Sequence, residues 1–168
     1  MDLTPKRADD SVTEMVQVVL PNDANPLGFI LGGTVMHLID IAGAIACHRH
    51  TRSLLVTAAV DDLQFLHPIK VGDLIILKSR VTCTFTTSLE VQVDVFSEET
   101  LTGKRLLTSR AFLTFVAISQ DGGRVRVPPL LVESEEERRT CEEAHALRAE
   151  RLRKKASPSP ESRAPSPD

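Results

Sequence analysis

The chain has 168 residues, of which 42% are hydrophobic and 26% charged, and a net charge of −3, values typical of one soluble globular domain with a tail. The mild negative charge and the absence of Trp and Tyr argue against a nucleic-acid-binding surface, which is usually basic and often stacks bases on aromatic rings. No apolar stretch is long enough to span a membrane, and the polar residues 1–11 do not resemble a secretory signal, so the sequence predicts a cytoplasmic protein with no membrane partner.

The first predicted elements are a strand and a long helix. Residues 12–20 form a β-prone run, and the next segment, 21–26, is rich in Asn, Asp and Pro and typical of a loop. Nearly every residue from 32 to 47 is apolar or small, which predicts a buried helix over about residues 33–50. The sequence His-Arg-His at 48–50 suits the C-terminus of that helix, and we interpret it as a solvated helix end rather than as metal ligands.

Four strand-like stretches follow the helix, at residues 54–66, 74–85, 89–96 and 104–119. Short connections between them favour antiparallel neighbours. A single long apolar helix and an antiparallel sheet predict an α+β fold in which the sheet wraps around the helix. One sheet with one helix leaves an open side, so we expect at least a dimer.

A charged helix is predicted after the break at Pro128 and Pro129. Ser134 and Glu137 form a capping-box pattern that begins this helix, and its acids precede its bases, the favourable order for the helix dipole. Its apolar face is thin, which places it on the surface. The chain therefore divides into a flexible N-terminus (1–11), a globular domain (12–123), a linker with the charged helix (124–156) and a disordered Ser/Pro-rich tail (157–168).

The cysteines Cys47, Cys83 and Cys141 are odd in number and far apart. This pattern favours free thiols in a reducing cytoplasm over a disulfide framework. Cys47 and His48 are adjacent on the predicted helix and point to different faces, so they make a poor nucleophile and base pair. No cluster has the spacing of metal ligands, and we expect neither a metal nor a cofactor.

Asp40 is the most unusual residue of the predicted helix. An unpaired carboxylate in an apolar environment commonly costs several kcal/mol, and chains tolerate such costs more often at functional sites than elsewhere. Asp40 is therefore either a catalytic group or a structural acid paired with His37, one turn earlier.

Gly32 and Gly33 begin the helix, and Asn25 lies in the loop before it. Backbone amides at a helix start are unpaired and lie in a partial positive field, where a developing oxyanion is stabilised. The alternative is a turn whose glycines only make room for packing.

Several segments in a fixed order resemble the hot-dog-fold acyl-CoA thioesterases, in the branch of the cytosolic acyl-CoA hydrolases. The resemblance covers about residues 12–119 and rests on DANPLG (23–28), LGG (31–33), LID (38–40), VTAAVD (56–61), Phe65, PIKVGD (68–73), SLEV (88–91) and AFLTFVA (111–117). It implies a hot-dog fold and the hydrolysis of acyl-CoA.

The resemblance implies a site shared between two protomers. The catalytic Asn and Asp of that family correspond to Asn25 and Asp40, so Asn25 of one protomer would face Asp40 of the other. The family commonly assembles as trimers of dimers, and we expect a homodimer that assembles in this way. Further expected contacts with the substrate are Gly32, Gly33, Thr57, Ser88 and Arg110, the last a candidate for the CoA phosphates.

A thioester is an easy substrate for such a site, because its leaving thiol has a pKa near ~8.5 and needs little acid assistance. Asp40 would activate water as a general base or attack directly as a nucleophile, and Asn25 would position the water or polarise the carbonyl. A backbone amide near Gly33 would hold the oxyanion. Pro26 and Leu31 depart from the family pattern, which leaves the acyl-chain preference open. The alternatives are a hot-dog hydratase or dehydratase, which needs a catalytic His, and a non-catalytic acyl-CoA-binding module.

Overall fold

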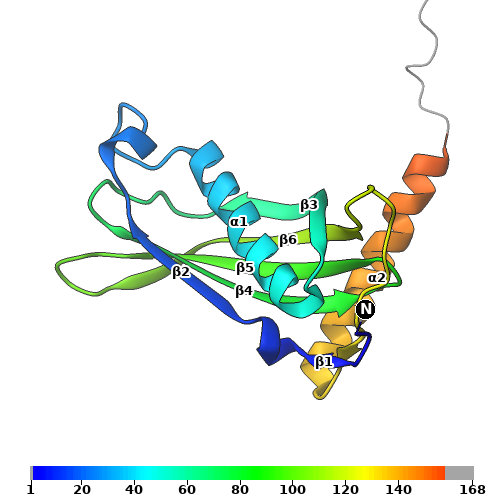
Figure 1. The fold of residues 1–168 in the computed structure, drawn as a ribbon. Coiled ribbons are helices and arrows are strands. Elements are labelled where there is room, and N and C mark those ends of the chain that lie inside the picture. Colours follow the sequence, from blue (N-terminus) through cyan, green and yellow to red (C-terminus); the bar gives the residue numbers. More distant parts are fainter. Residues whose placement is uncertain (1, 158–168) are drawn as a thin grey trace, which may run out of the picture.

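The computed structural model describes residues 2–157 and contains two long helices and a five-stranded sheet (Figure 1). The N-terminal elements are β1 (Lys6–Arg7), η1 (Ala8–Ser11), β2 (Thr13–Val18) and η2 (Pro21–Asp23). The long helix and the main strands follow as α1 (Gly32–Thr51), β3 (Leu54–Phe65), β4 (Leu74–Thr84), β5 (Ser88–Glu98) and β6 (Arg105–Ile118), and the chain ends with β7 (Leu130–Leu131) and α2 (Glu135–Ala156). The bounds of α1 and of the five main strands agree with the sequence prediction to within a few residues.

The main sheet is antiparallel throughout and has the strand order β2-β4-β5-β6-β3. Helix α1 lies across one face of this sheet, and α2 lies on the other side (Figure 1). The predicted α+β architecture, with an antiparallel sheet around one long helix, is confirmed. Strand β3 is at the edge of the sheet, so one side of its backbone has no strand partner in residues 2–157.

Helix α1 packs closely on the sheet because its inner side is made of small and branched apolar residues. A Cβ added at Gly43 would lie 3.2 Å from the side chains of both Phe115 and Val91, so only glycine lets the helix approach to this distance. Gly43 therefore faces the sheet.

The outer side of α1 is open in one protomer, which corrects the prediction of a helix buried on all sides. Met36 is 47% exposed, His37 is also exposed, and Asp40 is half-buried. At the C-terminus His48 and Arg49 are exposed as predicted, whereas His50 is fully buried. The Nε2–H of His50 donates to the carbonyl of Pro128 at 2.9 Å.

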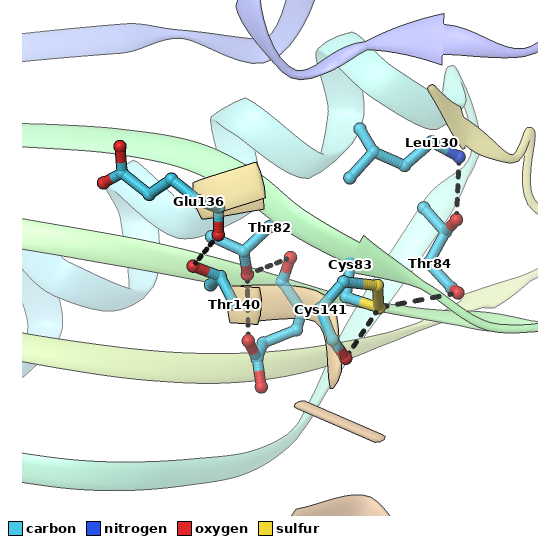
Figure 2. The surroundings of a disulfide bond; sticks show 8 residues. Thr82, Cys83, Thr84, Leu130, Glu136, Thr140 and Cys141 are labelled. Carbon is cyan, nitrogen blue, oxygen red and sulfur yellow. Dashed lines mark hydrogen bonds between the residues drawn. A yellow bond between two sulfur atoms is a disulfide. The ribbon is translucent and has the colours of Figure 1, made fainter. Parts of the chain in front are cut away.

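The prediction of three free thiols is wrong. Cys83 of β4 and Cys141 of α2 form a disulfide between residues 58 positions apart (Figure 2). Only Cys47 is a free cysteine, and it is buried in the core as expected, where burial raises the pKa of its thiol. Spacing in sequence does not show that α2 folds back onto β4, so it could not identify this pair.

The N-terminus from residue 6 onward is ordered, in contrast to the predicted flexible segment. Strand β1 pairs with β7, and Ala8 and Ser11 are buried. The Ser11 hydroxyl accepts a hydrogen bond from the Val81 amide at 2.9 Å, which ties this segment to β4. The predicted disordered tail lies outside the described residues from position 158 onward.

Candidate active site

Asn25 organises the loop before α1 with its own side chain. Its side-chain Oδ1 accepts hydrogen bonds from the backbone amides of Leu27 at 3.0 Å and Phe29 at 3.2 Å. The backbone amide of Asn25 donates to the Phe29 carbonyl at 2.8 Å. Gly28 turns the chain with a φ of +81°, a conformation that glycine adopts without strain. Since the two amides require an oxygen at Oδ1, the Nδ2 amino group points outward as a hydrogen-bond donor.

The N-terminus of α1 presents unpaired backbone donors beside this loop. Leu31 occupies the N-cap position and has no side chain that could cap the helix. The amides of Gly32 and Gly33 therefore remain in the first turn without an intrahelical acceptor. Open space surrounds the position of an added Cβ at Gly33, so an acyl group or a partner chain can approach these amides.

A cavity of about 420 Å³ lies between the Asn25 loop, the start of α1 and the end of β3. Its walls are mainly apolar, and the residues that line it are Asn25, Phe29, Ile30, Gly32, Val35, Phe65, Leu66, His67, Pro68, Ile69, Thr108 and Ser109. The volume falls within the range of small-ligand sites, which combine apolar walls with a few directed polar groups. Here those groups are the Asn25 amide and the helix start.

Asp40 is held from the neighbouring strand and not from its own helix. The hydroxyl of Thr57 on β3 donates to Asp40 Oδ1 at 2.7 Å. Among the described residues Asp40 forms neither an ion pair nor a hydrogen bond with His37, so the proposed structural pairing is not observed. Oδ2 remains available to accept a proton from a bound molecule.

One protomer contains two separate halves of the predicted site. Asp40 follows Gly32 by eight residues, which corresponds to about 12 Å along a helix. Asp40 does not line the cavity that contains Asn25 and Gly32. A thioester carbonyl held at the helix start would therefore be out of reach of Asp40 in the same chain.

Ser88 and Arg110 lie on the face of the sheet opposite α1. Arg110 pairs with Asp94 through two contacts, Nε–Oδ1 at 2.6 Å and an Nη–Oδ2 hydrogen bond at 3.0 Å, and this partner raises the pKa of the guanidinium. Ser88 is buried at the start of β5. The protomer does not bring these two residues together with Asp40, and a role for them in substrate binding stays a prediction.

Strand β3, the edge strand that contains Thr57 and lies beside Asp40, has exposed apolar side chains. Leu54, Val56, Val60 and Phe65 of β3 are 45–53% exposed. A long exposed edge strand with apolar side chains is a common site of association, because its backbone and side chains are both unsatisfied in the monomer. None of the described helices is long and apolar enough to cross a membrane.

Sequence reasoning missed most of the cavity. Thr108 and Ser109 are almost fully buried polar residues in an apolar strand, and this break in the apolar pattern was a usable signal. His67 also lines the cavity, beside Phe65 and Pro68, and is the histidine available to the hydratase alternative.

Comparisons of sequence give a consistent set of relatives. Residues 27–104 match the family profile described as Thioesterase superfamily. An uncharacterized acyl-CoA thioester hydrolase of Bacillus subtilis is 43% identical over 119 residues, which are 71% of this chain and 69% of that protein. The human cytosolic acyl coenzyme A thioester hydrolase is 34% identical over 141 residues, 83% of this chain but only 37% of the human protein.

Comparisons of structure agree. An apo-hexameric acyl-CoA thioesterase matches with a TM-score of 0.85 and 39% identity, covering 92% of this chain and 99% of that one. An acyl-CoA hydrolase from Staphylococcus aureus, solved with butyryl coenzyme A, coenzyme A and coenzyme A disulfide, matches with a TM-score of 0.80 and 31% identity, over 90% and 94% of the two chains. Three further structures of that hydrolase carry an alanine in place of an aspartate, an asparagine or a threonine.

Proposed function

Because the chain belongs to the hot-dog acyl-CoA thioester hydrolases of the thioesterase superfamily, we propose that it hydrolyses acyl-CoA to a carboxylic acid and free CoA. The observation that carries this proposal is Asp40, a carboxylate fixed by Thr57 on the open side of α1 with Oδ2 free. The reaction needs water and no cofactor, since CoA is part of the substrate and of the product.

Asp40 acts as the general base in this proposal. The Thr57 hydroxyl holds Oδ1, so Oδ2 takes a proton from water as the water attacks the thioester carbonyl. A positioned base of this kind typically contributes ~10²–10⁴-fold to the rate. Direct attack by Oδ2 to form an anhydride is the competing route, and the two are separated by trapping the acyl-enzyme with hydroxylamine.

Asn25 polarises the carbonyl in this proposal and does not accept a proton from water. Its Oδ1 is already bound by two backbone amides, so only the Nδ2 donor can face the substrate. Asn25 and Gly32 both line the cavity, so the Nδ2 donor and the free helix-start amide of Gly32 are available to the same bound carbonyl in this proposal. Donors arranged in advance around a developing oxyanion lower the barrier without reorganising during the reaction.

A homodimer completes the site. The separation of Asp40 from the helix start supports an arrangement in which Asn25 and the helix-start amides of one protomer meet the partner subunit's Asp40. The exposed apolar β3 supports an interface along this edge, and a two-fold axis would create two equal sites. The hexameric neighbour supports a further assembly into a trimer of dimers.

The alanine variants of the Staphylococcus aureus hydrolase support the same three residues. The replaced asparagine, aspartate and threonine are separated by 15 and 17 positions. Asn25, Asp40 and Thr57 have the same two separations. The cytosolic name of the human relative also supports a cytoplasmic location for this chain.

A complementation experiment tests both the reaction and the shared site. Asp40→Asn and Asn25→Ala are purified separately, and CoA release from a panel of acyl-CoAs is followed with a thiol reagent. Each variant alone is inactive. After subunit exchange, half of the dimers are mixed, and each mixed dimer has one intact site, so about a quarter of the wild-type activity returns.

Two outcomes would contradict this proposal. No recovery after confirmed subunit exchange would place both residues in one protomer's site. Tight CoA binding by the wild type without thiol release across the whole panel would instead favour a non-catalytic binding module. Asp9→Asn, an exposed carboxylate replaced in the same way, is the matched control and keeps full activity.

Hydration of an enoyl-CoA is the second candidate, since His67 lines the cavity and could act as its base. Crotonyl-CoA distinguishes the two reactions, because hydration consumes the conjugated double bond without releasing a thiol. A His67→Ala variant that still releases CoA from saturated acyl-CoAs excludes His67 as the essential base of hydrolysis.

A further inference from the structure

A second cluster of reactive side chains lies on the outer face of the sheet, away from Asp40. It joins Cys83 of β4 to Cys141 and His145 of α2, and the disulfide between the two cysteines crosses from strand to helix (Figure 2). The two sulfur atoms and a ring nitrogen of His145 all lie within 4.8 Å of one another. In the described part of the chain this is the one grouping of three or more such donors that could hold a metal ion.

We propose that Cys83, Cys141 and His145 bind Zn²⁺ when the disulfide is reduced. Two thiolates and an imidazole are the donors that zinc prefers, in tetrahedral geometry with one position left for water or a further ligand. The site is distinct from the thioesterase site and does not depend on the proposed hydrolysis.

The positions of the helical donors suit a single metal ion. Cys141 and His145 are four residues apart on α2, so their side chains lie on the same face of the helix. The His145 ring packs edge-on against Phe85 with centroids 4.9 Å apart and an angle of 82°. Phe85 directly follows β4, so the contact that orients the imidazole comes from the same strand end as Cys83.

An open cavity gives the ion a path to the cluster. The cavity has a volume of about 320 Å³ and is lined by Val132, Arg138, Cys141, Glu142 and His145. Zinc would therefore meet Cys141 and His145 first, with Cys83 behind them.

The charge balance favours the metal over bare thiolates. Cys83 is fully buried, and an unpaired thiolate there would be costly. A Zn²⁺ ion with two thiolates and a neutral imidazole has no net charge, so this penalty is avoided. Metal binding also releases both thiol protons, which makes the affinity rise with pH.

The disulfide and the metal exclude each other, and a dithiol reductant converts one state into the other. The reductant supplies two electrons and two protons to the Cys83–Cys141 bond and becomes a cyclic disulfide. Either state links α2 to β4. Such a link is useful because Ala144 is the one buried residue of α2, so the helix has little apolar contact to hold it.

Cobalt titration of the full chain tests the site directly. The protein is reduced under anaerobic conditions, the reductant is removed, and Co²⁺ is added as a spectroscopic probe for Zn²⁺. We expect a thiolate-to-cobalt charge-transfer band and the visible bands of tetrahedral Co²⁺, both abolished by Zn²⁺. Zinc should also protect two of the three thiols from a thiol reagent.

Two variants separate metal binding from folding. His145→Ala should weaken Co²⁺ binding by more than about tenfold, since even outer partners of a metal site are worth that much, and Cys141→Ser should abolish the charge-transfer band. His48→Ala, on the exposed end of α1, should bind as the wild type does. A fully reduced wild type without the band, or a His145→Ala variant of unchanged affinity, would overturn the proposal.

Discussion

The two faces of the main sheet bury different kinds of side chain. On the α1 face, Val91, Val93 and Phe115 are almost fully buried against apolar helix residues. On the α2 face, Thr82 and Glu90 are equally buried, but they are polar. The first face needs only shape and hydrophobicity, whereas the second needs a partner for every polar group.

The α2 face meets that need only in part. Arg151 donates to the Thr114 hydroxyl at 3.1 Å and approaches Asp61 at 3.4 Å, while the Thr82 hydroxyl donates to Glu90 Oε1 at 2.9 Å. Among the described groups, Glu90 Oε2 is buried without a hydrogen-bond partner, and Asp61 Oδ2 has the Arg151 ion pair but no hydrogen bond. Helix α2 is therefore held on the sheet by a few specific polar bonds and one disulfide, whereas α1 is held by many apolar contacts.

The largest expected effect is a loss of activity that distinguishes Asp40, the catalytic carboxylate on the α1 face, from Glu90, a structural carboxylate on the α2 face. Asp40→Asn should lower kcat by about 10³-fold, within the usual range for loss of a general base, and leave thermal unfolding unchanged because Asn still accepts from Thr57. Thiol release and thermal unfolding are measured on the same samples. Glu90→Gln should keep wild-type kcat, and comparable activity losses in both variants would erase the distinction.

The disulfide should make the next largest contribution, and only on the α2 face. Cys141→Ser should lower the free energy of unfolding of the oxidised protein by about 2–4 kcal/mol, because the cross-link restricts the unfolded chain. Guanidinium unfolding in the presence of a chelator measures this difference. Under reducing conditions the variant and the wild type should coincide.

Cys47→Ala is the matched control for this comparison. It removes the one free thiol, so its unfolding should still respond to reduction as the wild type does. Coincident curves for oxidised wild type and Cys141→Ser would mean that the link adds nothing to the stability of the α2 face.

Glu90 should make the stability of the α2 face depend on pH. Burial raises the pKa of Glu90 to about 7 from 4.5, against the opposing effects of the Thr82 hydroxyl and Arg151. Between about pH 4.5 and pH 7, Glu90 is therefore deprotonated in the unfolded chain and protonated in the native protein. The native state therefore becomes less stable as the pH rises, and the loss is complete above about pH 7.

Glu90→Gln should remove this penalty. Relative to the wild type, its free energy of unfolding should be higher at pH 8 than at pH 4.5 by up to about 3 kcal/mol. Urea unfolding across this pH range is the measurement, with the exposed Glu136→Gln as control. If the free energy of unfolding changed with pH in the same way in the wild type and in Glu90→Gln, Glu90 would be ionised in the native protein without an energetic penalty.

The sequence predicted the α1 face well because its signals are local. Leu89 and Val91 alternate with polar residues along β5, and the run of small and apolar residues marked α1. Asp40 stands out because it breaks a local apolar pattern, whereas the role of Asn25 was predicted from the family resemblance. An open side covered by a second protomer was expected, but the sequence did not show that the outer residues of α1, such as Met36 and His37, lie on it.

The α2 face could not be predicted for a physical reason. Glu90 belongs to the polar side of an alternating strand, and nothing near it in sequence shows that a distant helix covers it. Cys83 and Cys141 are brought together by the same docking, which depends on a few polar bonds and not on a periodic apolar stripe. Long-range contacts between polar groups leave no periodic signal in sequence.

Thr57 offers the smallest effect and the finest test of how the α1 face positions Asp40. Thr57→Ala should lower kcat by about tenfold, since a hydrogen bond to a charged group is worth roughly 1.5–3 kcal/mol and the exposed setting favours the lower end. Thr57→Ser keeps the donating hydroxyl and should restore most of the activity. KM should change little in either variant, because Thr57 acts through Asp40 and not on the CoA moiety. Steady-state kinetics of both variants over an acyl-CoA series is the measurement. A rise in KM at constant kcat would place Thr57 in contact with the substrate. Equal losses of kcat in Thr57→Ser and Thr57→Ala would show that the methyl group of Thr57, and not its hydroxyl, holds the carboxylate in position.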